Sequence, residues 1–217
     1  FKLHTMQATR ILAIRHGETA WNVDTRIQGQ LDIELNATGQ WQAERVAQAL
    51  SDEPLAAVYS SDLQRAWATA QAIGRASAVP VTAEPALRER HFGVLQGQTW
   101  AEIETHWPEQ AVLWRTRDPH WHPEGGESLL SLRERIEACV NRLAAAHLDE
   151  QIVLVAHGGV MDALYRLATG LDIQAPRSWQ LGNAAINRLL WTPQGLTLVG
   201  WGDARHLDHA SRDETTT

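Results

Sequence analysis

The residues best suited to chemistry in this sequence follow two apolar segments that both end in a His-Gly pair. The pairs are His16-Gly17, after residues 11–15, and His157-Gly158, after residues 151–156. Apolar runs of this length that stop at polar residues are typical of buried strands in a parallel sheet. Because ligands bind outside the carboxyl ends of such strands, we expect both histidines to lie in one pocket.

The residue types around these ends are those that phosphoryl transfer requires. A neutral imidazole such as that of His16 is a nucleophile, and the adjacent Arg15 guanidinium can fork onto a phosphate. Arg65 follows the polar cluster at residues 60–62, which we expect to cap a helix and to direct Arg65 toward the same sheet edge. Glu89, at the beginning of an irregular segment, is a candidate proton donor for a leaving alcohol.

Strand and helix patterns alternate along the chain. We expect parallel strands at residues 9–14, 56–59, 79–83 and 151–156, and a closing hairpin at 188–191 and 196–199. We expect helices at residues 36–51, from the 60–62 cluster to about 76, at 128–147 and from 157 to 167. This order predicts a three-layer α/β/α fold with a mostly parallel sheet.

The pattern is interrupted once, by a segment rich in proline and tryptophan. Residues 90–127 are predicted to form a small helical cap inserted into a single domain at 6–210, and residues 1–5 are interpreted as a cloning remnant before Met6. Four tryptophans in the cap recur every seven residues, at 100, 107, 114 and 121. Prolines prevent one continuous helix, so these rings either pack the cap against the body or form an apolar wall that selects bulky substrates.

Bulk properties limit the possible partners. The 217 residues are 44% hydrophobic and 21% charged, with a net charge of −7, which argues against a nucleic-acid partner. An anionic substrate must then be bound by a local cluster of arginine and histidine. The single cysteine, Cys139, lies on an apolar helical face, which favours a buried thiol and a cytoplasmic protein.

Neither a membrane nor a metal is expected. No apolar stretch is long enough to span a bilayer, and the N-terminus lacks the apolar core of a signal peptide. The histidines at 120, 122, 206 and 209 lack ligand spacing and are interpreted as solvated loop residues. We therefore expect no cofactor and a small phosphomonoester as the partner, while the oligomeric state stays open, with a homodimer as one option.

Five blocks in order resemble the histidine phosphatase superfamily, also called phosphoglycerate-mutase-like. They lie at residues 15–35 with Gly39, 59–70, 89–97, 125–128 and 155–159. The resemblance implies that His16 accepts the phosphoryl group and that Glu89 acts as general acid and then as the base that activates water. It also implies that the phosphoryl group is bound by Arg15, Asn22, Gln28, Gly29, Arg65, His157 and Gly158, without a metal.

The superfamily contains both mutases and phosphatases, and the cap favours a phosphatase. Cofactor-dependent phosphoglycerate mutases carry a lysine where this chain has Trp100, and a second arginine where it has Thr116 after Arg115. They also have a longer cap. The chain is most similar to the small broad-specificity phosphatases of the family. The alternatives are a mutase, with Arg115 and Arg117 holding the substrate carboxylate, and a non-catalytic binding protein on the same fold.

Overall fold

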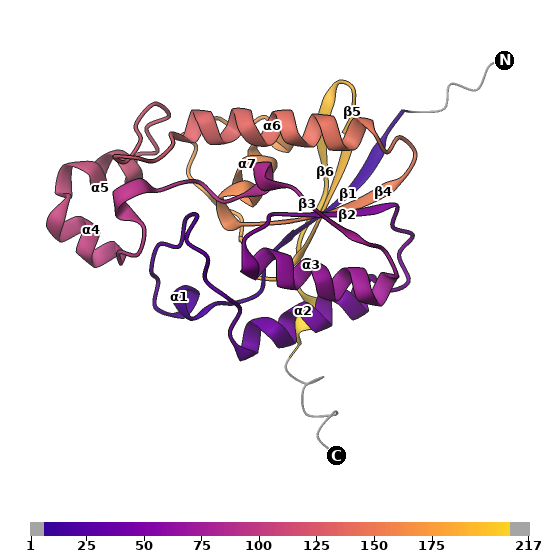
Figure 1. The fold of residues 1–217 in the computed structure, drawn as a ribbon. Coiled ribbons are helices and arrows are strands. Elements are labelled where there is room, and N and C mark those ends of the chain that lie inside the picture. Colours follow the sequence, from indigo (N-terminus) through magenta and orange to yellow (C-terminus); the bar gives the residue numbers. More distant parts are fainter. Residues whose placement is uncertain (1–6, 209–217) are drawn as a thin grey trace.

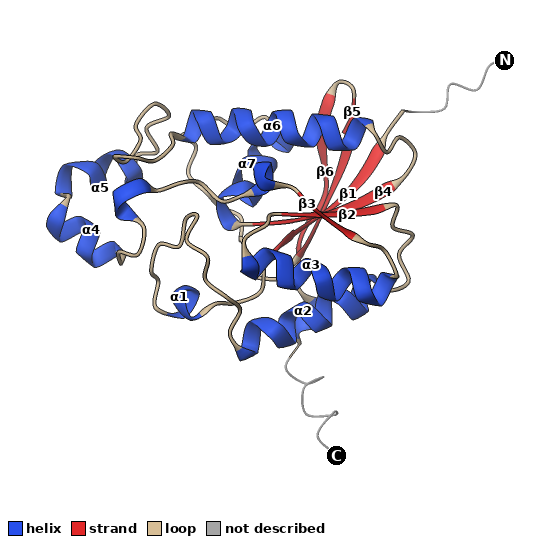
Figure 2. Cartoon of the chain, in the orientation of Figure 1, coloured by secondary structure: helices blue, strands red, loops and turns tan. Residues whose placement is uncertain are grey.

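A six-stranded sheet covered by helices on both faces forms the body of the protein (Figures 1 and 2). The computed structural model describes residues 7–208, so the prediction for residues 1–5 and that for His209 lie outside the described residues. The strand order is β3-β2-β4-β1-β5-β6. The predicted three-layer fold with a mostly parallel sheet is confirmed.

The central strands deliver both histidines to one edge of the sheet. The parallel strands are β1 (Thr9–Arg15), β2 (Ala57–Ser60), β3 (Val81–Ala83) and β4 (Gln151–Ala156), and the antiparallel hairpin is β5 (Ile186–Thr192) with β6 (Gly195–Asp203). β1 and β4 are neighbours, with Arg15 opposite Ala156. His16 and His157 therefore follow equivalent positions of adjacent strands.

Two helices cover each face of the sheet. α2 (Ala37–Leu50) and α3 (Gln64–Ser77) pack on one face, and α6 (Leu129–Ala145) and α7 (Gly158–Thr169) pack on the other (Figure 1). Alternate residues of β4 enter the two cores, which explains its continuous apolar sequence. Cys139 of α6 is 2% exposed, and burial raises the pKa of its thiol to about 11. It acts as a small core residue.

The predicted cap of α3 is wrong. Leu63 occupies the N-cap position and provides no side-chain hydrogen bond. The first helical amide, that of Gln64, donates instead to Oδ1 of Asp32 at 2.8 Å, and Asp62 forms an ion pair with Arg88. The capping oxygen thus comes from Asp32, in a separate loop. Residues adjacent to the helix in sequence do not indicate such a contact.

Short elements complete the body. α1 (Ala20–Val23) follows β1 and begins at a capping box formed by Thr19 and Asn22. Two 3₁₀ turns, η1 (Pro85–Leu87) and η3 (Arg205–Leu207), lie after β3 and β6.

Residues 90–127 project beside the body and contain η2 (Gly93–Leu95), α4 (Trp100–His106) and α5 (Pro108–Arg115) (Figure 1). This segment is held together and joined to Ile27 of the body by an apolar cluster, whose other members are Leu95, Ile103, Ala111, Phe92, Trp100, Trp107, Trp114 and Trp121. Its two ends meet, because the Glu127 amide donates to the His91 carbonyl at 2.9 Å.

Candidate active site

A cavity of about 390 Å³ opens at the carboxyl ends of β1 and β4, beside the cap. The predicted site residues that line it are Arg15, His16, Asn22, Gln28, Gly29, Arg65, Glu89 and Gly158. His157 is fully buried and is not among the described residues of the wall. Its ring centroid nevertheless lies 5.2 Å from that of His16, so the structure brings the predicted set together.

The hydrogen bonds of His16 determine which ring nitrogen is nucleophilic. Its Nδ1 lies 2.6 Å from the Gly17 carbonyl oxygen, which can only accept, so Nδ1 carries the proton and Nε2 carries the lone pair. Burial, followed by the Arg15 and Arg65 cations, holds the pKa of His16 well below its usual value. The ring is therefore neutral at pH 7, as a nucleophile must be.

His157 has the opposite tautomer. Its Nε2 lies 2.8 Å from Oγ of Ser61, which already accepts the Leu63 amide at 3.3 Å. In the described residues the hydroxyl proton of Ser61 has no acceptor other than Nε2, and leaving it unpaired would cost about 1–3 kcal/mol. Nε2 therefore accepts. Since burial, then Arg65 and His16, lower the pKa of His157 and keep it neutral, Nδ1 carries the proton.

Two buried arginines supply positive charge beside the histidines. Arg15 donates to the Leu181 carbonyl, and Arg65 donates to the carbonyls of Leu31 and Gly29 at 2.6 and 2.7 Å. Burial lowers the pKa of both guanidinium groups, to about 10 for Arg65, so both stay charged at neutral pH. Carbonyl oxygens orient these groups without neutralising them.

Three buried nitrogen atoms of this inner region have no partner in the part of the chain that the structure describes. They are Nε of Arg15, Nε of Arg65 and Nδ1 of His157. Buried donors are normally paired, so unpaired ones beside a cavity indicate an anionic ligand. The inner site thus combines one lone pair, on Nε2 of His16, with three donors suited to the oxygens of a phosphoryl group.

Glu89 is fixed at the cavity wall by two backbone amides. Its Oε1 accepts from the Arg90 amide at 2.7 Å, and its Oε2 accepts from the Gly159 amide, in the first turn of α7, at 2.8 Å. The carboxylate lies in the same cavity as His16. This placement suits proton transfer to or from an oxygen bound to phosphorus.

The other predicted phosphate ligands contribute in different ways. Oδ1 of Asn22 accepts the Thr19 amide, and Oε1 of Gln28 accepts the Thr19 hydroxyl, so the amide NH₂ group of each remains for a ligand. Gly29 has φ +53°, and a Cβ there would lie 2.2 Å from Oε1 of Gln96. A Cβ on Gly158 would lie 3.3 Å from the Arg15 guanidinium. At both positions the absence of a side chain lets a neighbouring side chain, Gln96 or Arg15, lie close against the backbone.

Several polar residues that support the site are not among those predicted from the sequence. Ser61 contacts His157, Thr69 accepts the Gly17 amide at 3.0 Å, and Asn183 donates to the His16 carbonyl at 2.9 Å. Ser61 and Thr69 lie within a block that carried the family resemblance, so their position was a usable signal. Asn183 lies in a loop without a motif, and nothing in the sequence identified it.

The outer part of the cavity is cationic. Among the described residues, eight arginines and two acidic residues line the cavity, and the outer arginines are Arg26, Arg90, Arg117, Arg133, Arg166 and Arg177. Asp162 pairs with Arg117 and with Arg166, both at 2.9 Å. Within residues 7–208, Arg133 and Arg177 form no ion pair.

The cap contributes an aromatic wall. Phe92 and Trp114 line the cavity, with their rings stacked at 4.7 Å, whereas Trp100 packs edge-on against Trp114 inside the cap cluster. All four tryptophans pack in the cap cluster, as one interpretation predicts, and Trp114 also lines the cavity. Selection of bulky substrates stays a prediction. Arg115, considered above as a carboxylate ligand, pairs with Glu104 at 3.3 Å and does not line the cavity.

The structure also addresses the other histidines. Within residues 7–208, no group of three or more histidine, cysteine, aspartate or glutamate side chains could hold a metal ion. Nδ1 of His122 lies 3.1 Å from the Pro123 carbonyl oxygen, and Nε2 of His206 lies 2.7 Å from that of Ala184. In the same range, no helix has the length and apolar character needed to cross a membrane.

Comparison with known proteins agrees with this arrangement. Residues 11–204 match the family model of the histidine phosphatase superfamily, branch 1. The chain is 39% identical over 212 residues to phosphoglycerate mutase-like protein 4 of Arabidopsis thaliana, covering 96% of this chain and 91% of the relative. It is 38% identical over 204 residues to a metal-independent phosphoserine phosphatase of the same plant, covering 93% and 84%.

Solved structures show the same relationship. The native structure of a mycobacterial glucosyl-3-phosphoglycerate phosphatase superposes with a TM-score of 0.81 at 34% identity, covering 91% of this chain and all of that one. The chain therefore belongs to the histidine phosphatase superfamily and is a phosphomonoester hydrolase of the histidine-phosphatase type.

Proposed function

We propose that the protein hydrolyses small phosphomonoesters in two steps through a phosphohistidine on His16. In the first step Nε2 of His16 attacks phosphorus, the bond to the ester oxygen breaks, and Glu89 gives its proton to the leaving alcohol. In the second step Glu89 takes a proton from water, the water oxygen attacks phosphorus, and the bond to Nε2 breaks to release phosphate.

One observation supports this mechanism most strongly. The lone pair of His16 is close to three buried donors without a protein partner, on Arg15, Arg65 and His157. The two guanidinium groups can stabilise the charge that a metal ion stabilises in other phosphatases. The name of the metal-independent phosphoserine phosphatase relative agrees with a reaction that needs no metal.

We further propose that the substrate carries a second anionic group. Arg133 and Arg177 face the cavity without an acidic partner in residues 7–208, while the phosphoryl group occupies Arg15 and Arg65. The printed names of two relatives, a phosphoserine phosphatase and a glucosyl-3-phosphoglycerate phosphatase, refer to phosphomonoesters that carry a carboxylate. A charge-assisted hydrogen bond to such a group contributes about 1.5–3 kcal/mol.

The test compares phosphoserine with phosphoethanolamine, which lacks only the carboxylate. We expect kcat/KM to be about 10- to 100-fold higher for phosphoserine. Replacing Arg133 and Arg177 with alanine should remove this preference and leave phosphoethanolamine hydrolysis unchanged. Equal kcat/KM values for the two substrates in the unaltered protein would contradict the second anionic group, and would leave the phosphohistidine mechanism standing.

Hydrolysis is the preferred outcome because the lysine and the second arginine that the resemblance assigns to mutases are absent, and of Arg115 and Arg117 only Arg117 lines the cavity. Trp100 lies in the apolar cap cluster, Arg115 pairs with Glu104 away from the cavity, and Thr116 carries no charge. A cytoplasmic location, supported by the single buried Cys139, and a homodimer also stay predictions. Localisation of a fluorescent fusion and light scattering of the purified protein would test them.

A further inference from the structure

The segment that carries Glu89 has little regular structure of its own. Residues 88–92 lie between η1 and η2 and belong to no helix or strand. Their carbonyl groups are partly buried and need hydrogen-bond donors that a helix or sheet would otherwise supply. The position of the Glu89 carboxylate therefore depends on whatever satisfies this backbone.

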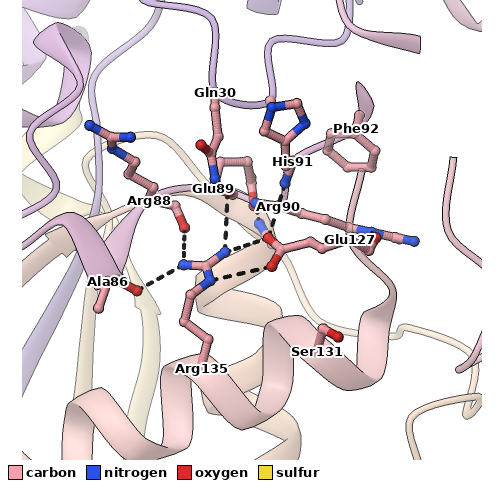
Figure 3. A network of polar contacts seen from close by, with 12 residues as sticks. Gln30, Ala86, Arg88, Glu89, Arg90, His91, Phe92, Glu127, Ser131 and Arg135 are labelled. Atoms are coloured by element: carbon pink, nitrogen blue, oxygen red, sulfur yellow. Dashed lines mark hydrogen bonds and ion pairs between the residues drawn. The ribbon is translucent and has the colours of Figure 1, made fainter. Parts of the chain in front are cut away.

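Arg135 of α6 donates to carbonyls at the start of this segment and just before it (Figure 3). Its Nη1 donates to the carbonyls of Ala86 and Arg88, both at 2.8 Å, and its Nη2 donates to the carbonyl of Glu89 at 3.3 Å. Gln30 adds a donor to the Glu89 carbonyl at 3.2 Å. A planar guanidinium can hold several carbonyls at once, which an ammonium group cannot do with the same geometry.

Glu127 completes the contact from the other side. Its Oε1 accepts from Nη2 of Arg135 at 2.5 Å and from the His91 amide at 3.0 Å. Both side chains of the Arg135–Glu127 pair are largely buried, at 24% and 20% exposed. The two side chains thus form hydrogen bonds with the backbone before and after Glu89, as Figure 3 shows.

We propose that Arg135, together with Glu127, is a positioning residue that holds Glu89 in place for proton transfer. Arg135 is not among the described residues that line the cavity, so it acts through Glu89 and does not touch the substrate. The Glu89 carboxylate can move little without losing its place, because the Gly159 amide in the first turn of α7 donates to it at 2.8 Å. A displacement of about 1 Å at such a group can cost on the order of 10²-fold in rate.

The inference rests on the proposed role of Glu89, and leaving-group dependence tests both. Proton donation matters for an alkyl phosphate and little for p-nitrophenyl phosphate, whose leaving group is a weak base. We expect Arg135→Gln to lower kcat by about 10²-fold on glycerol phosphate and by less than about 5-fold on p-nitrophenyl phosphate. A change that only disturbed folding would lower both rates equally.

Three further variants sharpen the test. Glu89→Gln combined with Arg135→Gln should be no slower on glycerol phosphate than Glu89→Gln alone, because residues that act as one unit are not additive. Arg142→Gln is the matched control: Arg142 lies on the same helix and forms an ion pair with Glu84 at 2.9 Å, and this change should leave both rates unaltered. If Arg135→Gln does not fold, Glu127→Gln provides the same measurement.

The outcomes separate the inference from the mechanism. One outcome would overturn the positioning role alone. In it, kcat falls equally on the two substrates in the Arg135 and Glu127 variants but selectively on glycerol phosphate in Glu89→Gln. Losses that add fully in the double variant would overturn it as well. Equal losses on the two substrates in Glu89→Gln itself would remove the proposed acid role, and the inference with it.

Discussion

Replacing Ser61 with alanine tests the tautomer assignment on which the phosphate site depends. Ser61 is fully buried, and in the described residues its hydroxyl is the hydrogen-bond partner of Nε2 of His157. Without the hydroxyl, Nε2 of His157 loses the donor from which it accepts a hydrogen bond. The ring form with the proton on Nδ1 is then no longer favoured by this contact. Rings with the proton on Nε2 would direct a lone pair, in place of a donor, toward the phosphoryl oxygens.

The structure sets the size of the effect. One unpaired buried nitrogen should lower the free energy of unfolding by about 1–3 kcal/mol. Loss of one donor to the developing charge of a transition state lowers kcat by about 10²–10³-fold, which is the upper limit here because some rings keep the active form. We therefore expect kcat to fall by about 10- to 100-fold, with a smaller change in KM.

Ser60→Ala is the matched control, because Ser60 is equally buried and its hydroxyl donates to the Ser61 carbonyl at 2.8 Å. It should lose stability but keep kcat. The assay combines p-nitrophenyl phosphate hydrolysis with nitrogen NMR shifts of histidine-labelled protein, which report the protonated nitrogen of each ring. Two results would refute the reasoning. One is an NMR shift that places the His157 proton on Nε2 in the unaltered protein, and the other is an unchanged kcat in Ser61→Ala.

Four further predictions follow from the site. His16→Ala should abolish turnover and acid-labile phosphate labelling; near-normal turnover in a folded variant would disprove the nucleophile. EDTA should leave the rate intact, and restoration by a divalent ion would show a metal requirement. Interconversion of phosphoglycerates should be slower than phosphate release, because Trp100 and Thr116 offer no charge; a coupled assay decides. Because folding lowers the pKa of His16 and of His157, the unfolded chain binds more protons below pH 6.5. The free energy of unfolding should therefore fall between pH 7 and 5.5, by up to about 1.4 kcal/mol per pH unit for each ring, and a flat urea-unfolding profile would contradict this.

The parts of the fold that could be predicted are those encoded by neighbouring residues. The continuous apolar run of β4 and the helical period of α6 are local sequence patterns, and both elements are predicted within a few residues of their bounds. The placement of His16 beside His157 followed from a rule about parallel sheets, because both residues follow strands that turned out to be adjacent.

What escaped prediction depends on contacts between distant segments. The amide that opens α3 is capped by Asp32, and the Glu89 segment is held by Arg135, a residue of another helix. Arg117 and Arg115 are two positions apart, yet Arg117 lies in a turn with φ +54° and reaches Asp162, whereas Arg115 points to Glu104. Periodicity gives no information about such pairings, because each is decided by how the elements pack.

The meeting of the two cap ends has a consequence for engineering. The chain leaves the body and returns to it beside one hydrogen bond, between His91 and Glu127, and the intervening residues form an apolar cluster to which the body contributes Ile27. Segments with adjacent ends tolerate exchange when their contacts with the host are kept; here these include the backbone hydrogen bonds of Ile27 with Gly97 and Gln98 and the Arg117–Asp162 ion pair. Residues 92–126 thus form a segment that is suited to replacement. Libraries grafted between these two anchors would vary what the pocket accepts while the strands continue to present an unaltered reaction centre.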